Sequence, residues 1–116
     1  MKETLEIRVS SGPGRVDLMR LRGPLDAHNN TRLLERCREI HEQRRHLVLN
    51  MHEVSFVSSS GIGVLLALNE DFRGDGVSLR IAHPSVAVRS AVALLNLDTF
   101  LAIYGSEDEA MRDLAA

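Results

Sequence analysis

The stretch LVLNMHEVSFVSSSGIGVLLAL, from Leu47 to Leu68, decides the fold of this chain. The short apolar run at 46–50 (HLVLN) lies between predicted helices and therefore predicts a central strand buried on both faces. The apolar residues after Gly61 predict a helix. Three serines, Ser58–Ser60, lie between the two. This layout places hydroxyl groups at the N-terminus of a helix, where free backbone N–H groups and the helix dipole favour a phosphate. The stretch therefore predicts a surface site that can be chemically marked on a protein that is not itself an enzyme.

Two strands and a helix are predicted before this stretch. Residues 4–10 alternate between apolar and polar, as a half-buried strand does. The turn sequence SGPG at 11–14 leads into a second strand, which Gly23-Pro24 is expected to end. A helix capped by Asp26 or Asn30 should follow, because apolar residues then recur at helical spacing. Its predicted buried face consists of Leu33, Leu34, Cys37, Ile40 and His41.

Alternating elements are predicted after the stretch as well. The helix from Gly61 is expected to end near 74–76, and a strand with Val77, Leu79 and Ile81 follows. A helix opening at Pro84-Ser85, an extended piece at 100–104 and a last helix capped by Ser106 and Glu109 complete the chain. The order β-β-α-β-α-β-α-β-α predicts one α/β domain over residues 1–116, with a mixed sheet of four to five strands and about four helices.

Composition excludes several classes of function. The chain has 116 residues, a formal net charge of −2 and only 3% aromatic residues, which argues against nucleic-acid or anionic-membrane binding. No apolar run reaches transmembrane length, and the N-terminal MKETLEIRVS lacks the apolar core of a signal peptide, so a cytoplasmic location is expected. The single cysteine, Cys37, cannot form an internal disulfide and is expected to be a buried apolar residue.

Catalytic, metal and cofactor sites are not predicted. No two of the five histidines (His28, His41, His46, His52 and His83) have the helical spacing of a metal-ligand pair. Gly61 and Gly63 lack the third glycine and the Gly-Lys-Ser/Thr of nucleotide-binding loops, so close helix–strand packing is the preferred interpretation and no cofactor is expected. Ser59, His83 and Asp26 offer the residue types of a hydrolase triad, but no G-x-S-x-G elbow surrounds Ser59.

Four stretches in order resemble one family. They are Leu21–Asp26 (LRGPLD), Leu47–Asn50 running into Val54–Val57, Ser58–Gly63 (SSSGIG), and a C-terminal segment with Leu97-Asp98, Ile103-Tyr104 and Glu107–Ala110. Together they resemble the STAS domain family, and specifically the small stand-alone anti-sigma factor antagonists of bacteria. The resemblance implies a STAS-like α/β fold.

The resemblance also implies a mechanism called partner switching. The unphosphorylated antagonist binds an anti-sigma factor, which is an ATP-dependent serine kinase, and so frees the sigma factor; phosphorylation ends the complex and a phosphatase restores it. The implied acceptor is Ser59, ahead of Ser60 and Ser58. ATP belongs to the partner, and the free chain is expected to be a monomer or a weak dimer. The predicted partner-binding residues are Asp26, His28, Asn30, Ser55, Phe56, Ser58, Ser59, Ser60, Gly61 and Ile62, with His52 nearby.

The chain departs from the family pattern at two positions. Ser58 and Asn50 stand where the family commonly has Asp. Either the kinase relies on one of the missing carboxylates, or the less acidic site accommodates a phosphate more easily because like-charge repulsion is reduced. The departures also keep other functions open: a STAS component of a stress-sensing scaffold, a regulator of phosphatases or secretion, and a small-ligand-binding STAS module.

Overall fold

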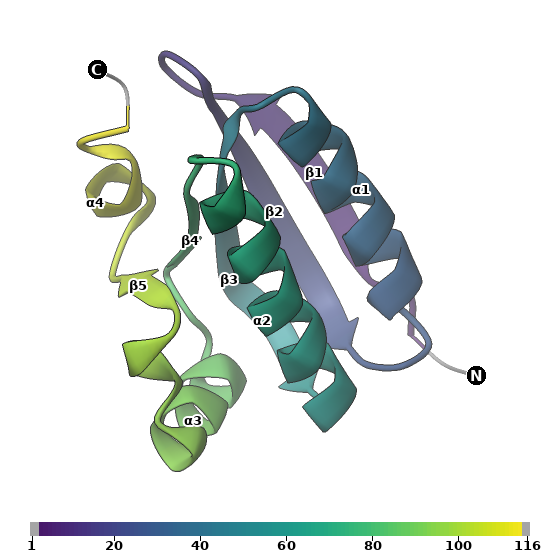
Figure 1. The fold of residues 1–116 in the computed structure, drawn as a ribbon. Helices are drawn as coiled ribbons and strands as arrows, with labels where there is room; N and C mark the ends of the chain where they lie inside the picture. The colour runs from purple at the N-terminus through teal and green to yellow at the C-terminus, as the bar shows by residue number, and fades with distance from the viewer. Residues whose placement is uncertain (1–2, 115–116) are drawn as a thin grey trace.

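A five-stranded mixed sheet forms the centre of the computed structural model, which describes residues 3–114 (Figure 1). Its strands lie in the order β1-β2-β3-β4-β5. The first two form the predicted antiparallel hairpin, and every later pair is parallel. The strands are β1 (Glu6–Ser11), β2 (Val16–Leu25), β3 (His46–Val57), β4 (Leu79–Ala82) and β5 (Ala102–Tyr104).

Helices cover both faces of the sheet. Helices α1 and α2 lie side by side across one face, and the short α4 packs on the other face over β3, β4 and β5 (Figure 1). The predicted order of strands and helices is confirmed, with one additional 3-10 turn, η1. The helices are α1 (Asn30–Glu42), α2 (Ser59–Gly74), α3 (Val86–Leu95), η1 (Leu97–Thr99) and α4 (Glu107–Met111).

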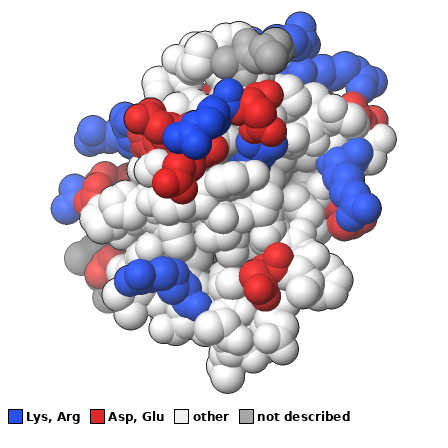
Figure 2. Space-filling model, turned by 90° about the vertical axis from the view of Figure 1, so that its left-hand side faces the viewer, with Lys and Arg blue, Asp and Glu red and all other residues white. Residues whose placement is uncertain are grey.

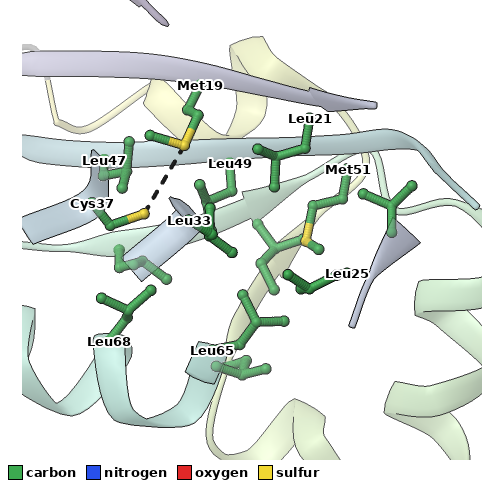
Figure 3. Packing of buried hydrophobic residues seen from close by; sticks show 14 of the residues in the cluster. Met19, Leu21, Leu25, Leu33, Cys37, Leu47, Leu49, Met51, Leu65 and Leu68 are labelled. Atoms are coloured by element: carbon green, nitrogen blue, oxygen red, sulfur yellow. Dashed lines mark hydrogen bonds between the residues drawn. The ribbon is translucent and has the colours of Figure 1, made fainter. Parts of the chain in front are cut away.

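The main core lies between the sheet and helices α1 and α2. Aliphatic side chains fill it, because the chain is poor in aromatics, and Phe72 is the largest buried side chain among the described residues. Figure 3 shows Met19, Leu47 and Leu49 of the sheet pointing toward Leu65 and Leu68 of α2. This arrangement confirms the prediction that the central strand is buried on both faces, since the neighbouring Val48 packs under α4 instead.

The buried thiol of Cys37 is part of this core. It is fully buried, and its Sγ lies 4.0 Å from the sulfur of Met19 (Figure 3). Burial raises its pKa to about 12, because a thiolate loses its hydration in an apolar site. Cys37 is therefore the apolar core residue that the sequence predicts.

Strand β3 continues to Val57, well beyond the predicted run at 46–50, and two irregularities interrupt its pairing with β2. The register shifts once between Arg20 and Arg22 and again between Gly23 and Pro24. The first shift inserts an extra residue in β3, so the side chains that face α1 and α2 change from odd positions to the even position Val54. The shifts also let β2 continue through Gly23-Pro24 to Leu25, so the expectation that this dipeptide ends the strand is wrong. Both strands thereby reach the same end of the sheet.

Charged groups hold α4 against the second face of the sheet. The guanidinium of Arg20 makes two hydrogen bonds to the carboxylate of Glu107, at 2.8 and 2.9 Å. The side-chain amide of Asn50 donates to the same carboxylate, and Arg80 pairs with Asp113. The hydrogen bonds from Arg20, and to a lesser extent the one from Asn50, lower the pKa of the Glu107 carboxyl.

The Glu107 contacts predict a pH-dependent contribution to stability. A carboxyl whose pKa is lowered on folding stabilises the native state above its unfolded pKa of about 4.5 and loses this effect as the pH falls through the folded value. Replacing Glu107 with Gln should therefore cost about 0.5–1 kcal/mol at pH 7, as for a partly exposed ion pair. Urea unfolding of both proteins from pH 7 to pH 3 measures the difference. If the difference in the free energy of unfolding between the two proteins stayed constant over this range, the prediction would be contradicted.

Candidate functional site

The three serines lie where β3 ends and α2 begins, beside the end of β2. The backbone N–H of Ser58 donates to the carbonyl of Leu25 at 3.0 Å. Ser58 is the N-cap residue of α2, with an extended backbone, and its Oγ accepts from the N–H of Gly61 at 3.0 Å. The predicted layout of strand, serine turn and helix is confirmed, although the helix begins at Ser59 rather than at Gly61.

A chain of hydrogen bonds engages two of the three serine hydroxyls. The side-chain amide of Asn30 donates to Ser60 Oγ at 3.0 Å, and Ser60 Oγ lies 2.9 Å from Ser58 Oγ. Ser58 Oγ in turn lies 3.4 Å from the carbonyl oxygen of Leu25. This chain ties the first turn of α2 to the first residue of α1 and to the end of β2. The hydroxyls of Ser58 and Ser60 therefore have structural roles.

Ser59 differs from its two neighbours. It is exposed, and none of the hydrogen bonds among residues 3–114 involves its hydroxyl. It occupies the first position of α2, where its own N–H and that of Ser60 have no intrahelical partner. The first turn of α2 has no acidic side chain. A phosphate on Ser59 would meet free N–H groups and the positive end of the helix dipole at little cost to the fold.

Gly61 is required by the close approach of α2 to β2. A Cβ atom at this position would lie 2.6 Å from the carbonyl oxygen of Leu25 and 3.0 Å from its Cγ. The prediction of close helix–strand packing is therefore confirmed for Gly61. For Gly63 it is wrong, because a Cβ there would meet no atom within 4 Å and the residue is exposed. The two glycines look equivalent in the sequence but differ in the side of the helix on which they lie.

The segment from Asp26 to Asn30 forms the adjoining wall of the site. Asp26 Oδ1 accepts hydrogen bonds from the backbone N–H groups of His28 and Asn29, at 3.1 and 3.2 Å. Asp26 thus holds the turn that precedes α1. Both predicted caps of α1 are wrong, because the N-cap residue is Asn29, which makes no side-chain cap bond, and Asn30 is the first helical residue.

Asn29 is an organising residue that the sequence analysis missed. Its side chain is almost fully buried, with 1% of the residue exposed. Its amide donates to the carbonyls of Glu3 and Pro24 and to Asp26 Oδ1, while its Oδ1 accepts from the N–H of Leu5. These bonds connect β2, α1 and the segment before β1. The only signal in the sequence is the polar cluster DAHNN, which does not reveal which amide is buried.

The remaining predicted contact residues fall into two groups. His28, Ser55 and Phe56 are exposed near the serine turn, and Phe56 has 54% of its surface exposed. Gly61 and Ile62 are buried, with Ile62 only 7% exposed in the core. The three exposed side chains are accessible to a partner. Gly61 and Ile62 instead pack in the interior and hold the serine turn in place.

Other residues considered in the sequence lie away from the serines. Asn50 contacts Glu107 on the face that α4 covers, and it precedes Ser58 by eight residues along β3. The expectation that position 50 surrounds the acceptor is therefore wrong. His52 stacks on His83, with ring centroids 3.9 Å apart. No hydrogen bond among the described residues joins Ser59, His83 and Asp26 into a triad.

Residues 3–114 contain no cluster of three or more His, Cys, Asp or Glu side chains arranged to hold a metal ion. No helix in this range is long and apolar enough to cross a membrane.

The cap made by Ser58 gives a direct test of the local geometry. Replacing Ser58 with Ala removes the acceptor for the Gly61 N–H, and should lower the free energy of unfolding by about 1 kcal/mol. Replacing it with Asp keeps an acceptor at the N-cap and should leave the stability within about 0.5 kcal/mol of the wild type. Urea unfolding followed by circular dichroism compares the three proteins. Equal losses in both variants would show that capping is not the role of this residue.

A family model described as "STAS domain" matches residues 8–110, and the chain therefore belongs to the STAS domain family.

One curated relative and two solved structures are similar to this chain. The chain is 26% identical over 99 residues to a protein from Paenibacillus polymyxa named anti-sigma F factor antagonist, covering 84% of this chain and 85% of that protein. An anti-sigma factor antagonist from Mycobacterium paratuberculosis superposes with a TM-score of 0.86 at 21% identity, covering 97% and 95% of the two chains. The Bacillus cell fate determinant SpoIIAA, in its phosphorylated form, superposes with a TM-score of 0.72 at 20% identity, covering 92% and 97%.

Proposed function

We propose that this chain is an anti-sigma factor antagonist that binds a kinase-type anti-sigma factor and is switched off by phosphorylation of Ser59. The single observation that carries the proposal is the difference among the three serines. Ser58 caps α2, Ser60 bonds to Asn30, and Ser59 alone presents a free hydroxyl at the exposed start of the helix. The curated relative named as an antagonist supports the general role.

The site supports a switch that acts on binding rather than on folding. A phosphate adds roughly −1.5 to −2 charges and three acceptor oxygens. At the start of α2 this charge meets the positive end of the helix, so the free chain tolerates it. In a complex the same charge would have to lose its hydration against the partner. Phosphorylation would therefore weaken the complex and leave the fold intact.

The two departures from the family pattern have separate consequences. Ser58 supplies the cap that an Asp would supply, without its negative charge beside Ser59. Asn50 contacts Glu107 on the far face and has no direct part in the proposed site. A less acidic start of α2 is the arrangement that accommodates a phosphate with little repulsion. In this proposal the chain itself is not an enzyme, the partner binds the ATP, and a serine phosphatase reverses the mark.

A pull-down from the native cells tests the assignment of the partner. The tagged wild-type chain should retain an anti-sigma factor with an ATP-binding kinase domain, identified by mass spectrometry. A Gly63→Arg variant is a useful comparison, because this exposed position lies one helical turn after Ser59 and the new side chain meets open space. The variant should fold and lose the partner. Recovery of a sensor scaffold without any kinase would overturn the proposal.

A further inference from the structure

Strand β1 is an open edge of the sheet. It stands first in the order of strands, and no element among residues 3–114 pairs with its outer side (Figure 1). It is 6 residues long, contains no proline, and keeps one continuous register with β2. An exposed strand of this kind offers unpaired N–H and C=O groups to another strand. The edge formed by β1 can therefore accept an added strand.

The opposite edge of the sheet is protected, whereas β1 is not. Strand β5 has only 3 residues, and a very short edge strand is one device by which proteins avoid pairing with other chains. Figure 2 shows the side of the molecule that bears β5, α3 and α4, and charged side chains of both signs gather in its upper part. Strand β1 has neither a short length nor a bulge.

The direction of the backbone groups in β1 follows from hydrogen bonds at its two ends. The N–H of Gly12, directly after β1, donates to the carbonyl of Val16 in β2 at 2.7 Å. Backbone groups alternate along a strand, so even-numbered residues of β1 face β2 and odd-numbered residues face outward. Leu5, directly before β1, agrees with this order. Its N–H donates to Asn29 and its carbonyl accepts from Arg32, away from β2.

Three residues of β1 therefore have outward backbone groups: Ile7, Val9 and Ser11. The turn and loop hydrogen bonds among residues 3–114 do not use their N–H or C=O groups. The side chains of Ile7 and Val9 lie on the face that α1 covers, since Ile7 packs against the main core and Val9 stands opposite the buried Met19. Val9, in the middle of the set, is nevertheless 37% exposed.

A second copy of β1 fits this edge. When two copies pair antiparallel around a two-fold axis at Val9, Ile7 lies opposite Ser11 and Val9 lies opposite its own copy. All the outward groups are then used, in about six backbone hydrogen bonds, two for each opposed pair. Arg8 lies opposite Ser10, so no like charges face each other. The two exposed valines meet at the axis.

Neighbouring registers are worse. An axis one residue earlier sets Arg8 directly opposite its own copy, which is destabilising. An axis two residues earlier sets Val9 opposite Leu5, whose N–H and carbonyl are already bonded. An axis one residue later sets Ile7 opposite Pro13, which has no N–H to donate. The sequence of β1 therefore complements itself in the register centred on Val9.

We infer that two copies of this chain associate through antiparallel pairing of β1, with Val9 at the two-fold axis. The two sheets then form one continuous sheet. The contact is about 20 Å long, at ~3.4 Å per residue, and falls short of the ~800 Å² that each partner contributes to a stable interface. The dimer should therefore exchange with the monomer, with a dissociation constant on the order of tens of micromolar. This inference does not depend on the proposed function.

Sedimentation equilibrium of the full chain between about 5 and 500 µM tests the inference, with Val9→Lys as the disruptive variant. Two lysines would face each other at the axis, so we expect the dimer to weaken about tenfold or more. Val86→Lys is the matched control, because it makes the same replacement at a position on α3 that is 69% exposed. The control should dimerise within about twofold of wild type.

A mixture of two variants tests the register itself. Val9→Lys and Val9→Glu should each be monomeric alone, whereas their equimolar mixture should form a heterodimer, because opposite charges then face each other across the axis. A wild-type chain that stays monomeric at about 500 µM would overturn the inference. So would a dimer that Val9→Lys does not weaken, or a mixture that stays monomeric.

Amide hydrogen exchange of the wild-type chain, followed by NMR, gives a readout that needs no variant. The N–H groups of Arg8 and Ser10 face β2 and should be protected at every protein concentration. Those of Ile7, Val9 and Ser11 should be protected only at concentrations where the dimer forms. Exchange at these three positions that does not change with concentration would contradict pairing through β1, even if Val9→Lys failed to fold.

Discussion

Replacing Ser59 with Asp should lower the affinity for the anti-sigma factor by at least about thirtyfold, or ~2 kcal/mol. The aspartate places a negative charge at the exposed first position of α2. In the free chain this charge faces water and the positive end of the helix, so the free energy of unfolding should stay equal or rise by about 0.3–1 kcal/mol. In the complex the charge loses its hydration. The affinity should therefore fall without any loss of stability.

Ser59→Ala is the matched control for this substitution. It removes a hydroxyl that makes no hydrogen bond within the described chain, so it should bind the partner as the wild type does. Ser60→Ala differs, because it breaks the bond to Asn30 and should weaken the turn itself. Calorimetry for affinity and urea unfolding for stability separate the two effects. Equal affinities of Ser59→Asp and Ser59→Ala would contradict the switch.

Replacing Gly61 with Ala should destabilise the fold by about 1–3 kcal/mol, the cost of adding an atom to a closely packed site. The new Cβ would lie 2.6 Å from the carbonyl oxygen of Leu25, which is backbone and cannot rotate away. Relief requires the first turn of α2 to move away from β2, and this movement would break the contacts of Ser58. The partner affinity should therefore fall together with the stability.

Gly63→Ala is the control, and it should raise the free energy of unfolding where Gly61→Ala lowers it. No atom lies within 4 Å of its added Cβ, so the substitution should stabilise α2 by about 0.5–1 kcal/mol through helix propensity. The two substitutions are chemically identical and two residues apart. Thermal and urea unfolding of both variants measure the difference. A Gly61→Ala protein as stable as Gly63→Ala would show that α2 does not approach β2 as closely as described.

Local patterns were sufficient to predict most of the fold. The alternation in β1, the helical spacing in α1 and the Ser106 cap each depend on residues that are close in sequence, and the Ser106 Oγ accepts from the N–H of Glu109 as expected. The prediction that the first strand is half-buried is wrong for most of β1, because within Glu6–Ser11 only Ile7 is partly buried. The order of elements along the chain was predicted, whereas the order of strands within the sheet, β1-β2-β3-β4-β5, is a finding of the structure. The serine turn could also be predicted from local sequence, because a buried strand precedes it and an apolar helix follows it.

Features that depend on contacts between distant residues could not be predicted. The two register shifts in β3 depend on its pairing with β2, which local sequence does not reveal. The different roles of Gly61 and Gly63 depend on the position of Leu25, which lies in another strand. Asn29 is buried because the end of β2 and the segment before β1 both pack against its side chain. Exposed residues of α3 such as Val86 and Leu94 were missed for the opposite reason: the apolar sequence of this helix resembles that of a core helix.

The measurement that tests the central claim most directly is the position of the phosphate. Incubating the purified chain with the anti-sigma factor kinase and ATP, followed by peptide mass spectrometry, locates the modified residue. The account predicts a single phosphate on Ser59, no phosphate on the Ser59→Ala chain, and release of the phosphorylated chain from the kinase. A phosphate on Ser58 or Ser60, or a phosphorylated chain that remains bound, would contradict it.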